Sequence, residues 1–226
     1  MISIYTLTLG REYYLKQLVT SIEDLGGAGN YEHHICFQGV KPSSDLARFL
    51  DKPRITTHLW EDNVGIAEGM NKIIPLLHGD IILKMDDDCV LRSTNFFKHV
   101  EEVHRLHPNI VFSPYPVGLI NNPGGPKGHA HVVSYGENTD TYYTLRFVNH
   151  IGGFARISPS ARVKNWTFTG DLIKGQSGNE DGQHSKKCIE SRIGMAYLEN
   201  ALIVEHQEST LGQHERYGEK YFKDRF

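Results

Sequence analysis

The sequence DIILKMDDD, residues 80–88, places three consecutive aspartates directly after a short apolar run. A run of this length predicts a buried strand over residues 80–85. In an open parallel sheet, ligands bind in the crevice at the carboxyl ends of the strands. We therefore expect Asp86, Asp87 and Asp88 to lie at a ligand-binding edge.

Strands and helices alternate around this stretch. The expected earlier strands are residues 2–8, 34–38 and 55–60. The expected helices, each with apolar residues on one face, are residues 15–25, 43–50, 65–77 and 93–106. Pro75 should shorten the third helix. Alternation at this spacing predicts right-handed crossovers and an α/β fold with a mostly parallel sheet.

The pattern changes after Pro114. Residues 114–128 are rich in proline, glycine and asparagine and predict a loop, whereas residues 171–181 are polar and glycine-rich and predict a mobile lid. The remaining expected elements are a strand pair at 131–135 and 142–148, a strand at 152–157, a helix at 180–193 and a strand at 198–205. We expect these to form a smaller antiparallel portion, with a tail or flap from Thr210.

Length and composition indicate one globular domain. The chain has 226 residues, of which 39% are hydrophobic and 23% charged, so disorder is not expected. No apolar run approaches the roughly 20 residues that a membrane span needs. Because Met1 leads directly into the first expected strand, we expect no signal peptide. Cys36, Cys89 and Cys188 form no CxxC pair. We therefore expect a reduced, cytoplasmic protein without a membrane span.

Charge is distributed unevenly along the chain. The net charge of −3 does not favour a polyanionic partner. Residues 146–192, however, contain eight lysines and arginines against four acidic residues. This stretch either suits an anionic acceptor or forms an ordinary solvated surface.

The three aspartates carry like charges that repel one another unless a cation joins them. Strand alternation predicts Asp86 and Asp88 on one side and Asp87 on the other. Hard oxygen ligands suit Mg²⁺ or Mn²⁺, and Mg²⁺ is typically held by one or two carboxylates together with phosphate oxygens. Taken alone, the triple aspartate is better explained as an acidic turn that ends a strand.

A second segment, NVGIAEGMN at residues 63–71, lies between an expected strand and helix. Its asparagines and glycines allow close backbone approach and present N–H donors at a helix N-terminus, which suits a phosphate or sugar. Taken alone, it fits an ordinary helix start.

Together these segments resemble the GT-A glycosyltransferases of the large family-2 group. The features of that family occur in order over nearly the whole chain: Thr6-Leu7-Thr8, Asn63-x-Gly65…Asn71, Asp86-x-Asp88, Glu180-Asp181 and His206. The resemblance implies a GT-A type, Rossmann-like sheet flanked by helices in a single domain. It also implies a nucleotide-sugar-binding half at residues 1–113, an acceptor and catalytic half at 114–209, and a tail at 210–226.

The resemblance implies a set of contacts to a nucleotide-sugar donor. The residues concerned are Thr6, Thr8, Arg11, Gln38, Asn63, Gly65, Asn71, Asp86 and Asp87. Gln38 stands where the family often has an aspartate that reads uracil; because glutamine both donates and accepts, a UDP-sugar is still favoured. Met70 stands where the family often has an arginine, so one donor contact is missing or displaced.

The resemblance also implies a metal site and a catalytic base. The metal, Mn²⁺ or Mg²⁺, is bound by Asp86, Asp88 and His206. In inverting members the Glu-Asp motif provides the base, which maps to Asp181 with Glu180 beside it. Such a base contributes roughly 10²–10⁴-fold by taking the proton of the acceptor hydroxyl. The implied reaction is an in-line displacement with inversion at the anomeric carbon.

Other interpretations stay open. The acceptor is a glycan or a lipid-linked sugar, or, as the basic residues 146–192 suggest, a hydroxymethylated base in DNA. A non-catalytic binder of nucleotide-sugars or carbohydrates would use the same scaffold. A nucleotidyltransferase is disfavoured, because residues 9–12 (LGRE) do not form the expected glycine-rich, basic loop.

Several histidines are interpreted as ordinary residues. His33-His34 and His129-x-His131 lack matching cysteines or acidic partners nearby, so they predict strand or loop positions without a metal. Residues 124–128 (GGPKG) lack the phosphate-loop pattern and predict a flexible turn.

Overall fold

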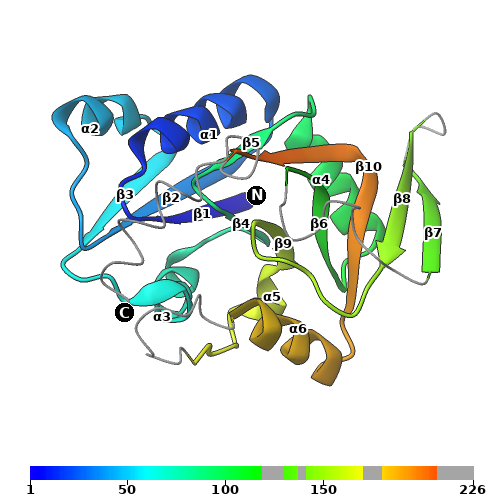
Figure 1. Ribbon diagram of the computed structural model, residues 1–226. Coiled ribbons are helices and arrows are strands. Elements are labelled where there is room, and N and C mark those ends of the chain that lie inside the picture. The colour runs from blue at the N-terminus through cyan, green and yellow to red at the C-terminus, as the bar shows by residue number, and fades with distance from the viewer. Residues whose placement is uncertain (119–129, 137–140, 170–179, 208–226) are drawn as a thin grey trace.

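The computed structural model describes residues 1–118, 130–136, 141–169 and 180–207. They form one large sheet with strand order β3-β2-β1-β4-β9-β6-β10-β8-β7, and β5 pairs with β10. Helices cover both faces of this sheet (Figure 1). None of the helices in these ranges is both long and apolar enough to cross a membrane.

The amino-terminal half builds the parallel part of the sheet. Its strands are β1 (Ile2–Thr8), β2 (Tyr31–Gln38), β3 (Ile55–Trp60) and β4 (Ile81–Met85). The intervening helices are α1 (Glu12–Leu25), α2 (Ser44–Leu50), α3 (Gly65–Ile73) and the 3₁₀ turn η1 (Ile74–Leu76). Because β1 pairs in parallel with β2 and β4, and β2 with β3, their carboxyl ends share one edge.

The second half adds strands in mixed orientation. Its elements are β5 (Cys89–Leu91), α4 (Phe96–Leu106), β6 (Ile110–Val117), β7 (Ala130–Tyr135), β8 (Tyr142–Phe147), β9 (Ala155–Pro159), α5 (Ser160–Val163), α6 (Glu180–Glu190) and β10 (Gly194–His206). β9 lies antiparallel between β4 and β6. The end of β10 pairs with β5, which returns the late strand to the end of β4.

Two apolar layers hold the helices on the sheet. On one face, α1, α2 and α4 pack against side chains such as Ile4 and Phe37. On the other face, α3 packs through Met70 in the same cluster as Tyr5. Alternation along β1 explains this division, because Ile4 and Tyr5 point to opposite faces.

The expected α/β fold class, with a mostly parallel sheet flanked by helices, is confirmed. The shortened helix at Pro75 is also confirmed, since η1 replaces its last turn. The expected loop from residue 114 is wrong at its start, because β6 continues to Val117 through Pro114 and Pro116. In the described part of the chain, β6 beyond Phe112 pairs only with β10, and a strand paired on one side tolerates prolines.

Other boundaries differ from expectation. The short β5 was not anticipated, α4 begins at Phe96 after Asn95 (φ 53°), and α6 ends at Glu190. β10 already begins at Gly194 and has a register shift between Leu198 and Ile203. Most of the expected loop and lid, at 119–128 and 171–179, and the tail lie outside the described residues. Asp181, expected at the lid's end, lies in α6.

Candidate active site

Asp86, Asp87 and Asp88 form the turn between β4 and β5, at the carboxyl edge of the sheet. The Asp86 N–H donates to the Phe154 carbonyl oxygen at 2.8 Å, and the Cys89 N–H donates to the Asp86 carbonyl oxygen at 3.2 Å. The Asp87 and Asp88 side chains are buried, whereas the Asp86 side chain is 36% exposed. Two buried carboxylates require charged or hydrogen-bonding partners.

The end of β1 and the segment after it supply those partners. The Thr8 hydroxyl donates to Asp87 Oδ2 at 2.5 Å. The Arg11 guanidinium forms ion pairs with Asp87 and, at 3.1 Å, with Asp88. A planar guanidinium with five donors suits two adjacent carboxylates. Thr8, Arg11 and Asp87, predicted from separate parts of the sequence, are therefore neighbours in the structure.

His206 reaches the same cluster from the end of β10. Pairing of His206 with Cys89 in the β5–β10 ladder sets its position, and its Nε2 lies 3.4 Å from Asp88 Oδ1. The Gln207 N–H donates to the Asp88 carbonyl oxygen at 2.9 Å. One ligand atom each from Asp86, Asp88 and His206 all lie within 4.8 Å of one another. Two carboxylates and an imidazole at this spacing fit a divalent cation such as Mn²⁺.

Asp181 lies in the first turn of α6, where a negative charge is favourable. Its Oδ2 accepts a hydrogen bond from the Gly153 N–H at 2.8 Å, and its Oδ1 accepts one from Arg156 Nη1 at 2.9 Å. A Cβ atom at Gly153 would overlap the Asp181 carboxylate. The side chain of Asp181 stays 31% exposed while both of its oxygens are oriented.

Lys84 joins the Asp181 region to the aspartate cluster. The buried Lys84 ammonium donates to Asp86 Oδ1 at 2.6 Å and to the Gly153 carbonyl oxygen. Burial would lower the pKa of Lys84, but the Asp86 and Asp181 carboxylates raise it by more, so the ammonium stays charged. Gly153 thus contacts Lys84 through its carbonyl and Asp181 through its N–H.

Glu180 lies beside Asp181 but is buried. Burial raises the pKa of Glu180, and the neighbouring Asp181 charge raises it further. Its Oε2 makes no hydrogen bond within the described ranges. The two acidic residues therefore differ, because Asp181 is partly open and hydrogen-bonded whereas Glu180 is enclosed.

Sequence reasoning missed Lys84, Gly153 and Arg156. Two of them carried a signal, since Lys84 and Arg156 interrupt apolar strands. Lysine and arginine are almost never fully buried unless they are paired, and both side chains prove to be buried in ion pairs. Gly153 gave no signal, because its role depends on a neighbour on α6.

Gln38, Asn63 and Gly65 lie at the ends of the neighbouring strands. Gln38 ends β2 and is buried, and in the described structure its Oε1 makes no hydrogen bond. Asn63 and Gly65 are exposed at the start of α3, where the Gly65 N–H donates to Asn63 Oδ1 at 3.0 Å. Gly65 has φ of +79°, and no described atom lies within 4 Å of the place that a Cβ would occupy, which leaves its backbone accessible.

Thr6 and Asn71 have structural partners. The Thr6 hydroxyl lies 3.0 Å from His33 Nε2 in the core, and burial lowers the pKa of His33 to about 3, so that imidazole is neutral. The Asn71 side chain donates to the Phe168 carbonyl oxygen at 2.6 Å and accepts from the Phe168 N–H at 2.8 Å. The donor contacts implied for Thr6 and Asn71 stay predictions, and the observed contacts hold the fold together.

Asn71→Ala should therefore destabilise the protein. It leaves the N–H and carbonyl groups of the buried Phe168 without their partners, which costs about 1–3 kcal/mol of unfolding free energy. Urea unfolding of the variant measures this loss, with the exposed Asn30→Ala as a control. Equal stability of Asn71→Ala and the parent protein would contradict this role.

Structural comparison finds the same fold in several solved structures. Pyrobaculum calidifontis mannosyltransferase PcManGT in complex with GDP-Man and Mn²⁺ aligns with a TM-score of 0.67 and 10% identity, covering 95% of this chain and 59% of that one. S. aureus TarS 1-349 in complex with UDP-GlcNAc gives 0.65 and 15%, with coverages of 92% and 60%. GalNAc-T7 with UDP, GalNAc and Mn²⁺ gives 0.64 and 9%, with coverages of 91% and 43%.

These likenesses establish the fold, and the chain spans less than two thirds of each of the three structures. No curated protein sequence matches significantly. The sequence profile described as "Glycosyl transferase family 2" matches residues 3–161. Because this match covers well over half of the chain and includes the Asp86–Asp88 turn, the resemblance to GT-A enzymes is confirmed, and the chain belongs to glycosyl transferase family 2.

Proposed function

We propose that the chain transfers a sugar from a nucleoside-diphosphate sugar to an acceptor hydroxyl, with a divalent metal ion and with inversion at the anomeric carbon. One observation carries the proposal. The candidate base Asp181 is connected to the donor-side carboxylate Asp86 through Gly153 and Lys84. Residues far apart in the sequence thereby form one continuous polar site at the sheet edge.

On the donor side, Asp86, Asp88 and His206 would hold Mn²⁺ or Mg²⁺. Such an ion, when bound, offsets the negative charge that develops on a leaving diphosphate. Arg11, held beside Asp87 and Asp88, adds positive charge at the same edge. Asp87, oriented by Thr8 and Arg11, would face the donor.

The base of the nucleotide would lie near Gln38. The unbonded Oε1 of this buried side chain supports a hydrogen bond to a ligand, because a buried amide oxygen without a partner is costly. The Gly65 backbone and Asn63, exposed at the start of α3, would approach the donor beside it. We favour a UDP-sugar as donor. The solved structures differ in the nucleotide, since TarS is in complex with UDP-GlcNAc and PcManGT with GDP-Man.

On the acceptor side, Asp181 would act as general base. The acceptor oxygen attacks the anomeric carbon, the bond from that carbon to the diphosphate oxygen breaks, and the electron pair leaves with the diphosphate. The hydroxyl proton passes to Asp181. The Gly153 N–H and Arg156 fix the carboxylate orientation, and the buried Glu180 would position the first turn of α6.

The acceptor is a glycan, a lipid-linked sugar or a hydroxymethylated base in DNA. The structure gives less support for a DNA acceptor than the basic composition of residues 146–192 suggests. Arg146 pairs with Glu199 and Arg156 with Asp181, so neither is a free surface charge. Transfer to hydroxymethylated DNA, with binding that weakens steeply as salt rises, would distinguish this acceptor. Donor binding without transfer to any of these acceptors would favour the non-catalytic alternative.

Nucleotide-sugars should stabilise the protein in a metal-dependent way. At a hundredfold excess over Kd, a donor that binds only the folded state adds about 2.7 kcal/mol of stability. A thermal-shift panel of UDP-, GDP- and other nucleotide-sugars, each with and without Mn²⁺, measures the effect and identifies the base. The proposal fails if no nucleotide-sugar raises Tm in either condition.

A further inference from the structure

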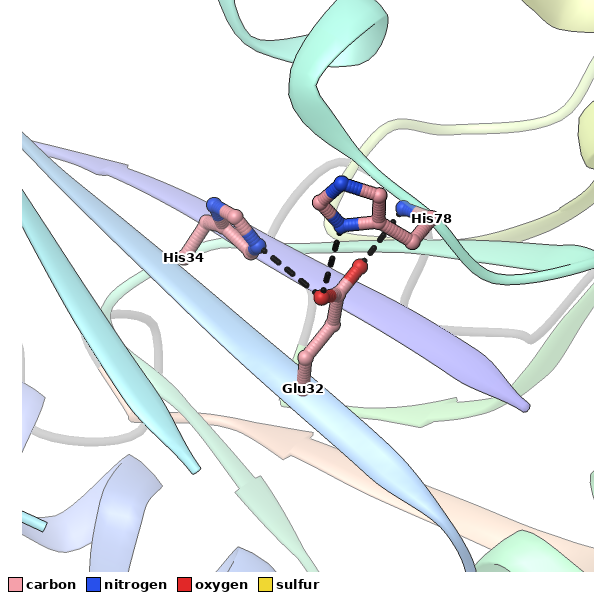
Figure 2. Close-up of side chains that lie close together, drawn as sticks. All are labelled: Glu32, His34 and His78. Carbon is pink, nitrogen blue, oxygen red and sulfur yellow. Dashed lines mark hydrogen bonds and ion pairs between the residues drawn. The ribbon is translucent and has the colours of Figure 1, made fainter. Parts of the chain in front are cut away.

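A second cluster of metal-ligating side chains lies away from the active site, at the amino ends of the parallel strands. It comprises Glu32 and His34 on β2 and His78 in the segment before β4, and their side chains point toward one another (Figure 2). The aspartate turn lies at the opposite, carboxyl edge of β4. From Ser3, beside Glu32, to Thr8, beside Asp87, β1 advances five residues, or roughly 16 Å.

The two oxygens of Glu32 have different partners. Oε1 accepts from the Ser3 hydroxyl at 2.5 Å and from the His78 backbone N–H at 2.7 Å. Oε2 faces two imidazole nitrogens, His78 Nδ1 at 3.2 Å and His34 Nε2 at 3.4 Å. The hydrogen bonds from Ser3 and from the backbone and ring of His78 hold the Glu32 carboxylate in place. One oxygen thus anchors the residue while the other is directed between the two imidazoles.

His34 is oriented as a metal ligand would be. Its side chain is only 6% exposed, and its Nε2 makes no hydrogen bond within the described residues while facing Glu32. On the other side of the ring, His34 Nδ1 lies 3.0 Å from His58 Nε2. A neutral His58 ring can accept a hydrogen bond from the His34 Nδ1–H through its own Nε2. A proton on His34 Nδ1, donated to His58, leaves Nε2 with its lone pair directed at the cluster.

The spacing fits a small tetrahedral cation. Two ligand atoms about 2.0–2.1 Å from a tetrahedral zinc ion lie roughly 3.3–3.4 Å apart. The two distances from Glu32 Oε2, 3.2 and 3.4 Å, agree with this. Two imidazoles with one carboxylate suit Zn²⁺ and similar first-row ions better than Mg²⁺. His78 is 74% exposed, so water can reach the fourth position.

We propose that Glu32, His34 and His78 form a second metal site that binds Zn²⁺ or a similar first-row divalent cation. The ion would join β2 to the segment that leads into β4. It would stabilise the folded sheet at the edge opposite the candidate active site. The proposal is independent of the sugar-transfer reaction, since none of its ligands belongs to the donor or acceptor residues.

The test uses the full chain after chelator treatment, with Zn²⁺ as the probe. Asp88→Asn weakens the candidate donor-side metal site, so the zinc that remains reports on the second site. In this background we expect one zinc per chain, lost in Asp88→Asn/His78→Ala but kept with the exposed His150→Ala as control. Because an outer-shell partner alone is worth about 10–100-fold in metal affinity, loss of the ligand His78 should weaken zinc binding by at least about 100-fold.

Thermal unfolding gives a second readout. In the Asp88→Asn background, zinc at a hundredfold excess over Kd should raise the folded-to-unfolded ratio about 100-fold, and adding His78→Ala should abolish this increase. The metal-free stability of His78→Ala should fall by no more than about 1 kcal/mol, because the lost ring contact to Glu32 is solvent-exposed and the backbone bond to Glu32 remains. Equal zinc affinity with and without His78 in the Asp88→Asn protein would overturn the proposal.

Discussion

Asp181→Asn should lower kcat for sugar transfer by about 10²–10⁴-fold, the usual contribution of a positioned general base. The amide keeps an oxygen that can accept from the Gly153 N–H, but the buried Arg156 loses its ion pair, so the unfolding temperature of the variant must be recorded as well. The amide cannot accept the acceptor proton at neutral pH. The measurement is the rate of nucleoside-diphosphate release with a competent acceptor, together with the donor Kd, which should change little.

The control for this variant is Glu190→Gln. Glu190 is an exposed carboxylate on the same helix, paired only loosely with Lys186 at 3.8 Å. The substitution removes a negative charge from α6 without touching Gly153 or Arg156. If Asp181→Asn retains full activity, or loses donor binding as strongly as turnover, then Asp181 is not the base.

Asp88→Asn should abolish the metal-dependent part of donor binding. A divalent cation contributes several kcal/mol of charge stabilisation to the transition state, so its loss corresponds to about a 10³-fold fall in kcat/KM. The Mn²⁺-dependent thermal shift with a nucleotide-sugar should also disappear. Isothermal titration of Mn²⁺ with the nucleotide present measures the metal affinity of the parent protein and of Asp88→Asn.

Asp80→Asn is the matched control, because Asp80 is a solvent-exposed aspartate just before the same strand. Asp88 also pairs with Arg11, so the metal-free unfolding temperature of Asp88→Asn must be recorded. A variant that remains folded and keeps its Mn²⁺ response would exclude Asp88 from the metal site.

The sequence was sufficient to predict the parallel half of the fold. Alternating apolar strands and one-sided helices require a helix-covered parallel sheet, and β1 to β4 follow it closely. The second half was harder, because its strands depend on distant partners. β5 has only three residues and exists through its pairing with β10, and β6 passes through two prolines because β10 supports it.

The residues of the candidate site also fall into two groups, those in local sequence motifs and those that depend on distant strand pairing. The aspartates after β4 and the Glu180-Asp181 pair were singled out through the family resemblance, because each lies in a short local motif, and their roles stay predictions. Lys84 and its bond to Gly153 depend on the β4–β9 pairing, which no local pattern reveals. His34 was considered and set aside as a metal ligand although Glu32 is two residues away, because the third member, His78, lies 46 residues beyond Glu32.

Residue 153 is a glycine, and this affects how an inactive homologue would be recognised from its sequence. A single methyl group there would collide with the Asp181 carboxylate while leaving every aspartate of the chain in place. If Asp181 is the base, as proposed, a family member could keep all of its conserved-type aspartates and glutamates and still have lost turnover. A survey that counts those acidic residues alone would overstate the number of working enzymes, and the residue preceding Phe154 should be inspected as well.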